Sequence, residues 1–145
     1  LDVCFRQIEN IILNEKKRED ITTSLIKKYN LNLKIDPISS NLTPGHFIKF
    51  NYIIDENKIS FDEEYLKNLG TMLNLYKKDK DIIFIDMILF LTDNYFIRIS
   101  KQNLFTNEKI IEYKRFIFES INKFFIYNLN QNTLLSNINN KINNE

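Results

Sequence analysis

The longest apolar stretch of the chain lies in residues 81–100, which read DIIFIDMILFLTDNYFIRIS. Its apolar part, 82–91, carries the single charge of Asp86. It is also shorter than the roughly 17–20 residues that a membrane-spanning helix needs. The Thr92-Asp93-Asn94 cluster that follows is typical of a turn, and residues 95–100 then alternate with the period of a strand. We therefore predict a hairpin of 82–91 with 95–100, with a short buried helix at 82–91 as the alternative.

A strand at 82–91 would divide its side chains between two faces. Asp86 would lie on the lightly covered face, whereas Leu89 would point toward the main helical layer. The strand hypothesis thus predicts that Asp86→Leu is tolerated and that Leu89→Asp is severely destabilising, because a buried unpaired carboxylate is costly.

Residues 1–29 have the apolar spacing of a helix. In heptad register the polar break falls at NEKKRED, residues 14–20, so the segment is either the end of a coiled coil or an ordinary amphipathic helix. The apolar a and d positions are the candidate partner-binding residues: Leu1, Cys4, Ile8, Ile11, Leu25 and Tyr29.

Two shorter strands are predicted before the apolar stretch. Residues 31–35 and 48–54 alternate apolar with polar positions, and the Ser-, Pro- and Gly-containing segment 39–46 between them is typical of a loop. The sequence SFDE at 60–63 then matches a capping box. A helix follows over about 65–76, in which Gly70 costs about 1 kcal/mol relative to Ala.

Thr106 can cap a long helix over about 107–127. Its apolar stripe comprises Ile110, Tyr113, Ile117, Ser120, Ile121 and Phe124. Residues 128–145 are a polar, low-complexity tail, in which Leu134, Leu135 and Ile138 could add a last helical turn or two.

These elements together predict an α+β fold. A coiled-coil-like helix at 1–29 precedes a globular domain at 30–127, and the tail at 128–145 follows it. The domain would contain a small, mostly antiparallel sheet with an inserted helix in the insertion 55–81, and the long C-terminal helix would pack on the sheet.

Charge and composition argue against some classes of function but do not identify one. The net charge is +1, from 20 basic and 19 acidic residues, so no overall field attracts nucleic acid or an anionic membrane. The single cysteine, Cys4, has no internal disulfide partner, which favours an intracellular, reducing compartment. No stretch is long enough to span a membrane.

No motif indicates catalysis or a cofactor. His46 and Cys4 are the only histidine and cysteine, which are too few for a zinc site without carboxylates. The carboxylates at 55–56 and 62–64 could bind a cation or act as an acid–base pair, although a solvated turn and an acidic helix start explain them better. We expect no catalytic residue, no cofactor and no metal.

The predicted element order resembles that of the RWD domain, especially the globular heads of coiled-coil subunits of the outer kinetochore. The similar segments are SLIKKYNLNLKI at 24–35, FIKFNYI at 47–53, the predicted hairpin and NEKIIEYKRFIFESINKFF at 107–125. The resemblance implies a coiled coil entering a sheet that a final helix closes, and it implies a nuclear location. The proline turn of many RWD domains is absent, and no cysteine follows the predicted sheet, so ubiquitin-conjugating activity is not implied.

We therefore expect a non-catalytic protein–protein interaction or scaffold subunit of a hetero-oligomeric complex, bound to a protein partner through the N-terminal helix. The first alternative is a nucleic-acid-associated subunit, based on the lysine pairs 16–17, 27–28 and 77–78 and the many aromatic residues. The second alternative is a carboxylate-dependent enzyme.

Overall fold

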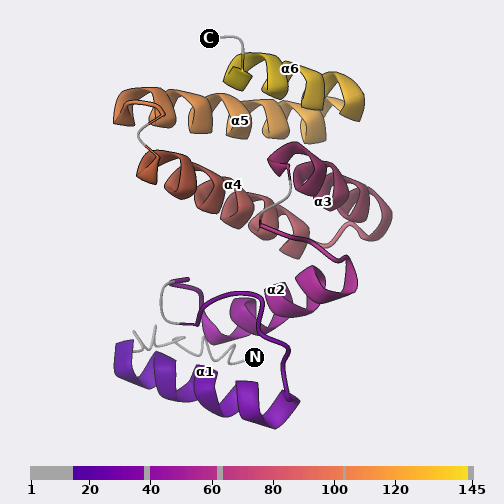
Figure 1. Ribbon diagram of the computed structural model, residues 1–145. Coiled ribbons are helices and arrows are strands. Elements are labelled where there is room, and N and C mark those ends of the chain that lie inside the picture. The colour runs from indigo at the N-terminus through magenta and orange to yellow at the C-terminus, as the bar shows by residue number, and fades with distance from the viewer. Residues whose placement is uncertain (1–14, 38–39, 62–63, 103, 144–145) are drawn as a thin grey trace, which may run out of the picture. The chain divides into compact units, whose positions relative to one another are not determined.

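The structure is a computed structural model that describes residues 15–37, 40–61, 64–102 and 104–143. The described residues form helices and contain no strand (Figure 1). The helices are α1 (Glu15–Tyr29), α2 (Pro44–Glu56), α3 (Tyr65–Asp79), α4 (Ile83–Lys101), α5 (Asn107–Tyr127) and α6 (Gln131–Asn143). The chain divides into two compact units, residues 1–58 and 59–145.

The predicted hairpin is wrong, because residues 83–101 form the single helix α4. Thr92 and Asn94 were expected to turn the chain. Instead the Thr92 hydroxyl donates to the Ile88 carbonyl at 2.7 Å, and the Asn94 side-chain amide donates to the Phe90 carbonyl at 2.9 Å. These bonds run back one helical turn, so the polar side chains are accommodated inside the helix without breaking it.

The burial pattern of α4 also follows a helix. Its buried residues recur at intervals of three and four: Ile83, Phe84, Met87, Ile88, Leu91, Thr92, Phe96 and Ile99. Leu89, which the strand hypothesis placed toward the helical layer, is exposed. The predicted difference in stability between Asp86→Leu and Leu89→Asp therefore has no basis, because it assumed the two faces of a strand and this segment is a helix.

The predicted strand at 48–54 is also wrong, because these residues lie within α2. Thr43 is the N-cap residue of α2 and its hydroxyl accepts from the His46 backbone N–H at 3.3 Å, while Pro44 occupies the first turn. A Thr-Pro pair is a strong helix start, because the threonine oxygen satisfies a free N–H and proline has none to satisfy. Residues 31–35 have no strand partner in the part of the chain that the structure describes.

Both corrections remove the sheet, and with it the α+β class and the RWD-like architecture. The resemblance depended on strands that follow a coiled coil and on a helix that covers them. In the described residues the corresponding segments are helices. The similarity in apolar spacing therefore does not extend to the fold.

Residues 15–58 of the first unit form a helical hairpin of α1 and α2. Its loop is held by Asn51, a buried residue of α2. The Asn51 side-chain oxygen accepts from the backbone N–H groups of Lys34 and Ile35 at 2.7 and 3.2 Å, and its amide donates to the Phe47 carbonyl at 2.8 Å. Asp55 adds a 3.4 Å ion pair with Lys34.

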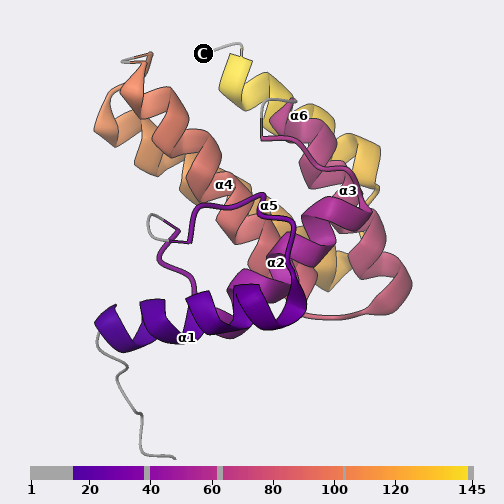
Figure 2. The same cartoon turned by 60° about the horizontal axis from the view of Figure 1, so that its bottom comes forward.

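The second unit contains α3 to α6. α3 contacts α4 and α6, and α5 likewise contacts α4 and α6, so the four helices enclose one core (Figures 1 and 2). The core includes the fully buried side chains of Leu69, Met87, Ile88, Ile117 and Ile138. These apolar stripes face one another as expected for amphipathic helices that bury a shared core.

Three predicted features of this unit can be compared directly with the structure. The helix predicted at 107–127 is confirmed as α5, with Thr106 as its cap. The helix predicted over about 65–76 is present as α3, but its N-cap residue is Glu64 rather than the Ser60 of the predicted capping box. The last turn or two expected in the tail is the 13-residue helix α6.

Gly70 lies in the middle of α3, where α6 approaches closely. The Gln131 side-chain amide of α6 donates to the Gly70 carbonyl at 3.1 Å. A Cβ at this position would lie 3.3 Å from Leu135 Cδ1. Glycine thus weakens α3 locally but allows the close contact between α3 and α6.

Candidate functional site

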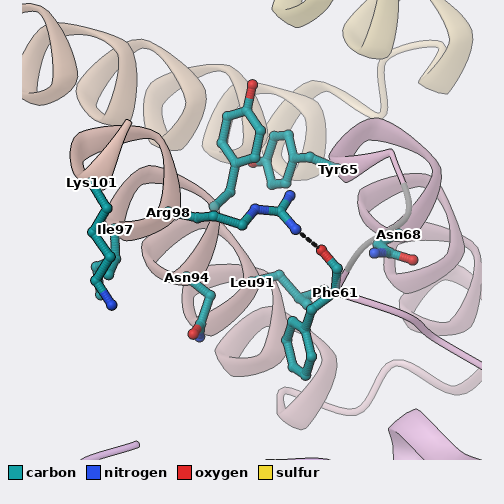
Figure 3. Close-up of a pocket in the computed structure, with 9 residues that line it drawn as sticks. Phe61, Tyr65, Asn68, Leu91, Asn94, Ile97, Arg98 and Lys101 are labelled. Carbon is teal, nitrogen blue, oxygen red and sulfur yellow. Dashed lines mark hydrogen bonds between the residues drawn. The ribbon is translucent and has the colours of Figure 1, made fainter. Parts of the chain in front are cut away.

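A pocket of about 200 Å³ lies beside the C-terminal half of α4, in the second unit (Figure 3). We call it the Arg98 pocket. Its lining combines apolar side chains, two side-chain amides, two tyrosine rings and two cations: Phe61, Leu91, Ile97, Asn68, Asn94, Tyr65, Tyr95, Arg98 and Lys101. Six of these residues, from Leu91 to Lys101, lie on α4.

Arg98 connects α4 to the segment that precedes α3. Its guanidinium Nη1 donates to the Phe61 carbonyl, as Figure 3 shows. Asn68 of α3 holds the same segment, because its amide donates to the Ser60 carbonyl at 2.9 Å. The wall of the pocket formed by Phe61 is therefore fixed from both α3 and α4.

Two tyrosines form the aromatic side of the pocket. The rings of Tyr65 and Tyr95 stack with centroids 4.4 Å apart and an interplanar angle of 17°. The Tyr65 hydroxyl lies 2.9 Å from the Thr92 hydroxyl. The single Thr92 proton is already donated to the Ile88 carbonyl, so Tyr65 must be the donor.

Burial favours the neutral phenol form of both rings. It raises the pKa of Tyr65 far above its ordinary value, and the hydrogen bond to Thr92 offsets only part of this rise. Burial also raises the pKa of Tyr95, against the opposing effect of the Arg98 charge. Near neutral pH both phenols are protonated, so they can donate hydrogen bonds and stack but do not act as bases.

The charge of the described lining is positive. Arg98 and Lys101 are its two charged residues, and Lys101 is exposed. An adjoining pocket of about 300 Å³ shares Tyr65, Tyr95 and Arg98 with the first and adds Glu64. The described lining of the Arg98 pocket thus combines apolar walls with positive charge, while Glu64 gives the adjoining pocket a negative charge.

An exposed apolar stripe runs along α4 to this pocket. Ile82, Leu89 and Ile97 are 66%, 40% and 53% exposed, and Ile97 also lines the pocket. Their spacings of seven and eight residues place them on one face of the helix. We call these three residues the α4 stripe. Asp93, four residues from both Leu89 and Ile97, lies between them on this face and forms an ion pair of 2.6 Å with Lys114 of α5.

The partner-binding residues predicted from the sequence are only partly described. Leu25 is half-buried and Tyr29 is 48% exposed, both on α1. Leu1, Cys4, Ile8 and Ile11 lie outside the described residues. Binding of a partner through the N-terminal helix therefore stays a prediction.

The other candidate side chains do not converge. His46 lies in the first turn of α2, with Nδ1 3.1 Å from the Thr43 hydroxyl, and Asp55 and Glu56 lie at the end of that helix. Asp86 is on α4, and residues 62 and 63 are not described. Among the best-formed pockets of the described residues, none contains two of these groups. Within those same residues no three His, Cys, Asp or Glu side chains are placed to hold a metal.

Sequence reasoning missed the Arg98 pocket because of the strand hypothesis. In a strand, Tyr95 and Arg98 would point to opposite faces. In a helix the three-residue spacing brings Tyr95, Arg98 and Lys101 onto one side. The signal was present in YFIRISK, but it can be recognised only once the period is known to be helical.

Comparison with protein-family models, with curated protein sequences and with solved structures finds no match to this chain. Among the residues that the structure describes, no helix combines the length and the apolar character needed to cross a membrane.

Proposed function

We propose that the chain is a non-catalytic protein–protein interaction subunit that binds a partner segment along α4. The supporting observation is the α4 stripe, which leads to the Arg98 pocket through Ile97. Single exposed apolar residues are common, but an aligned series beside a pocket is typical of a binding surface. Partner segments usually gain most of their affinity from a few side chains anchored in such pockets.

The N-terminal helix is proposed as a second contact with a protein partner, in a hetero-oligomer within a reducing compartment. Tyr29 on α1 is exposed, and the apolar heptad positions 1–11 precede this helix in the sequence. Two separate contacts would raise the overall affinity by their effective concentration without either contact being strong.

Association of the full chain with its partner tests the proposal. The tagged chain and two variants are expressed in the source cells, and the purified complexes are compared by sedimentation and mass spectrometry. We expect one partner in constant proportion with the wild type and its loss from the double variant Leu89→Lys, Ile97→Lys. The matched control is Ile126→Lys, which replaces an exposed isoleucine of α5 and should retain the partner.

The absence of a constant partner, or equal loss from both variants, would contradict the proposal. Self-association that disappears only in the double variant would identify a second copy of the chain as the occupant and would also contradict it. Removal of residues 1–29 tests the N-terminal contact separately, because the 59–145 unit carries the α4 stripe.

A nucleic-acid-associated role is the second candidate, and a cluster at the ends of α3 and α5 favours it. The Lys77 ammonium lies 4.8 Å from the Phe124 ring centroid, and that of Lys80 lies 5.5 Å from the Tyr76 centroid. Tyr127 nearby in sequence is 68% exposed. Phe124 is buried and Tyr76 is half-buried, so of these three rings only the exposed Tyr127 can stack on a base of a single strand.

Binding to labelled single-stranded RNA and DNA tests this candidate. In a plot of the logarithm of the affinity against the logarithm of the salt concentration, each phosphate contact should contribute about −0.7 to the slope. No binding at about 50 mM salt, where such contacts are strong, would exclude the candidate. A weaker complex in Lys77→Gln, Tyr127→Ala with Lys16→Gln unchanged would support it.

A further inference from the structure

The Arg98 pocket has the size of a single side chain rather than of a whole small molecule. Its volume is about 200 Å³, whereas pockets for drug-sized ligands start at roughly 300 Å³. Phe61, Leu91 and Ile97 supply its apolar walls. A single apolar group, such as the side chain of a leucine, matches both the size and the lining.

The charges around the pocket define what should accompany that apolar group. Lys101 is exposed at the rim and forms no ion pair or hydrogen bond with the other described residues. The Arg98 guanidinium is engaged with the Phe61 carbonyl, so among the described lining residues Lys101 is the cation available to meet a charge on a ligand. No carboxylate is among the described lining residues. The rim therefore favours an anion about one residue away from the apolar group.

The side-chain amides favour a peptide as the carrier of these groups. Asn94 uses its N–H to hold the Phe90 carbonyl, and Asn68 uses its own for the Ser60 carbonyl. Each side chain still has a carbonyl oxygen, which can accept a hydrogen bond from a peptide N–H. The pocket is also continuous with the α4 stripe at Ile97, along which further residues of the same peptide can pack.

We infer that the Arg98 pocket binds an acidic peptide segment of the partner, with one apolar side chain inside the pocket and a neighbouring carboxylate at Lys101. This inference rests on the proposed function, because it names the chemistry of the partner that α4 binds. It assigns Lys101 as the residue that selects for the negative charge. Arg98 has a second role as the residue that keeps the Phe61 wall in place.

Two small probes that differ only in charge test the inference. N-acetyl-leucine carries a carboxylate beside its apolar side chain, and N-acetyl-leucinamide is the neutral equivalent. Each is titrated into the isotope-labelled full chain at low ionic strength, and binding is followed by the NMR signals of the Asn68 and Asn94 amides and the Ile97 methyls. We expect millimolar binding, with the acid bound about three- to fivefold more tightly than the amide.

Two variants locate the charge preference. Lys101→Gln should abolish the difference between the probes and leave the affinity for the amide unchanged. Lys78→Gln is the matched control, since this residue is exposed in the last turn of α3 and does not line the pocket, and it should keep the difference. Raising the salt concentration should reduce the difference in the wild type.

Equal binding of the two probes, signals that change elsewhere in the chain, or a preference that persists in Lys101→Gln would overturn the inference. The proposed function would survive such a result if the partner is still lost from the double variant Leu89→Lys, Ile97→Lys. Conversely, charge-selective binding at the pocket without any partner at α4 would reject the proposed function while leaving the pocket as a site for small acids.

Discussion

Three consecutive residues of α4 provide a stringent test of the helical assignment. Met87 and Ile88 are fully buried in the core of the second unit, while Leu89 is 40% exposed on the α4 stripe. We predict that Met87→Ala and Ile88→Ala each lower the free energy of unfolding by about 2–5 kcal/mol, since each removes a buried apolar side chain and leaves a cavity.

Leu89→Ala should cost less than about 1 kcal/mol. Much of the Leu89 side chain is already in water, and alanine has a slightly better helix propensity than leucine. The chain unfolds in urea with a slope of about 2 kcal/mol per molar for a protein of this size. The expected midpoint shifts are therefore about 1–2.5 M for the two buried positions and below about 0.5 M for Leu89.

Urea titrations followed by far-UV circular dichroism measure these shifts, since the signal is dominated by helices. A strand would give a different order, because Met87 and Leu89 would then share one face and Ile88 would lie on the other. Similar losses for Met87→Ala and Leu89→Ala, with a clearly different loss for Ile88→Ala, would refute the helical assignment and the pocket built on it.

Other substitutions test individual contacts. Asn51→Ala should lower the stability of the first unit by about 2–3 kcal/mol in thermal unfolding, because two backbone N–H groups lose their acceptor. A loss below about 0.5 kcal/mol would mean that water replaces the side chain. Gly70→Ala should change stability by less than about 1 kcal/mol, because the gain in helix propensity opposes the close contact with a flexible Leu135 methyl. Gly70→Val should be clearly destabilising in urea. Equal stability of the two variants would argue against the close approach of α6. The raised pKa of Tyr65 stabilises the fold below pH 10, where both states are protonated, and this contribution is lost as the pH rises above 10, because only the unfolded chain then releases its proton. Between pH 9 and 11 the free energy of unfolding from urea titrations should therefore fall less for Tyr65→Phe than for the wild type, by about 1.4 kcal/mol over the whole range. Parallel pH profiles would show that this phenol is not buried.

The elements predicted correctly from the sequence share a long apolar period and a clear start. α5 has both, with Thr106 as its cap and a stripe that recurs over 21 residues. The described part of the predicted N-terminal helix is also helical, over Glu15–Tyr29. For such segments the local signal is sufficient, because many turns of one face repeat the same information.

The elements predicted incorrectly contain short runs rich in isoleucine and phenylalanine. These residues favour strands, and in a run of seven to ten residues they match a period of two about as well as a helical period. In α2 the Thr43-Pro44 start was the local signal that could have decided the question. In α4 the polar residues Thr92 and Asn94 favoured the incorrect prediction of a turn, because their hydrogen bonds to the preceding helical turn form only once the helix exists.

The sequence by itself therefore determined which segments are apolar, where the best-capped helix begins and ends, and the near-neutral charge of the chain. The tertiary structure decided that α4 is a helix and that Tyr95, Arg98 and Lys101 share one side of it. The physical reason is that a helix in a protein gains most of its stability from the packing of its apolar face and little from the propensities of its own residues. It is stable because its apolar face packs against other helices, as α4 does against α3 and α5, and that packing is a property of the folded chain.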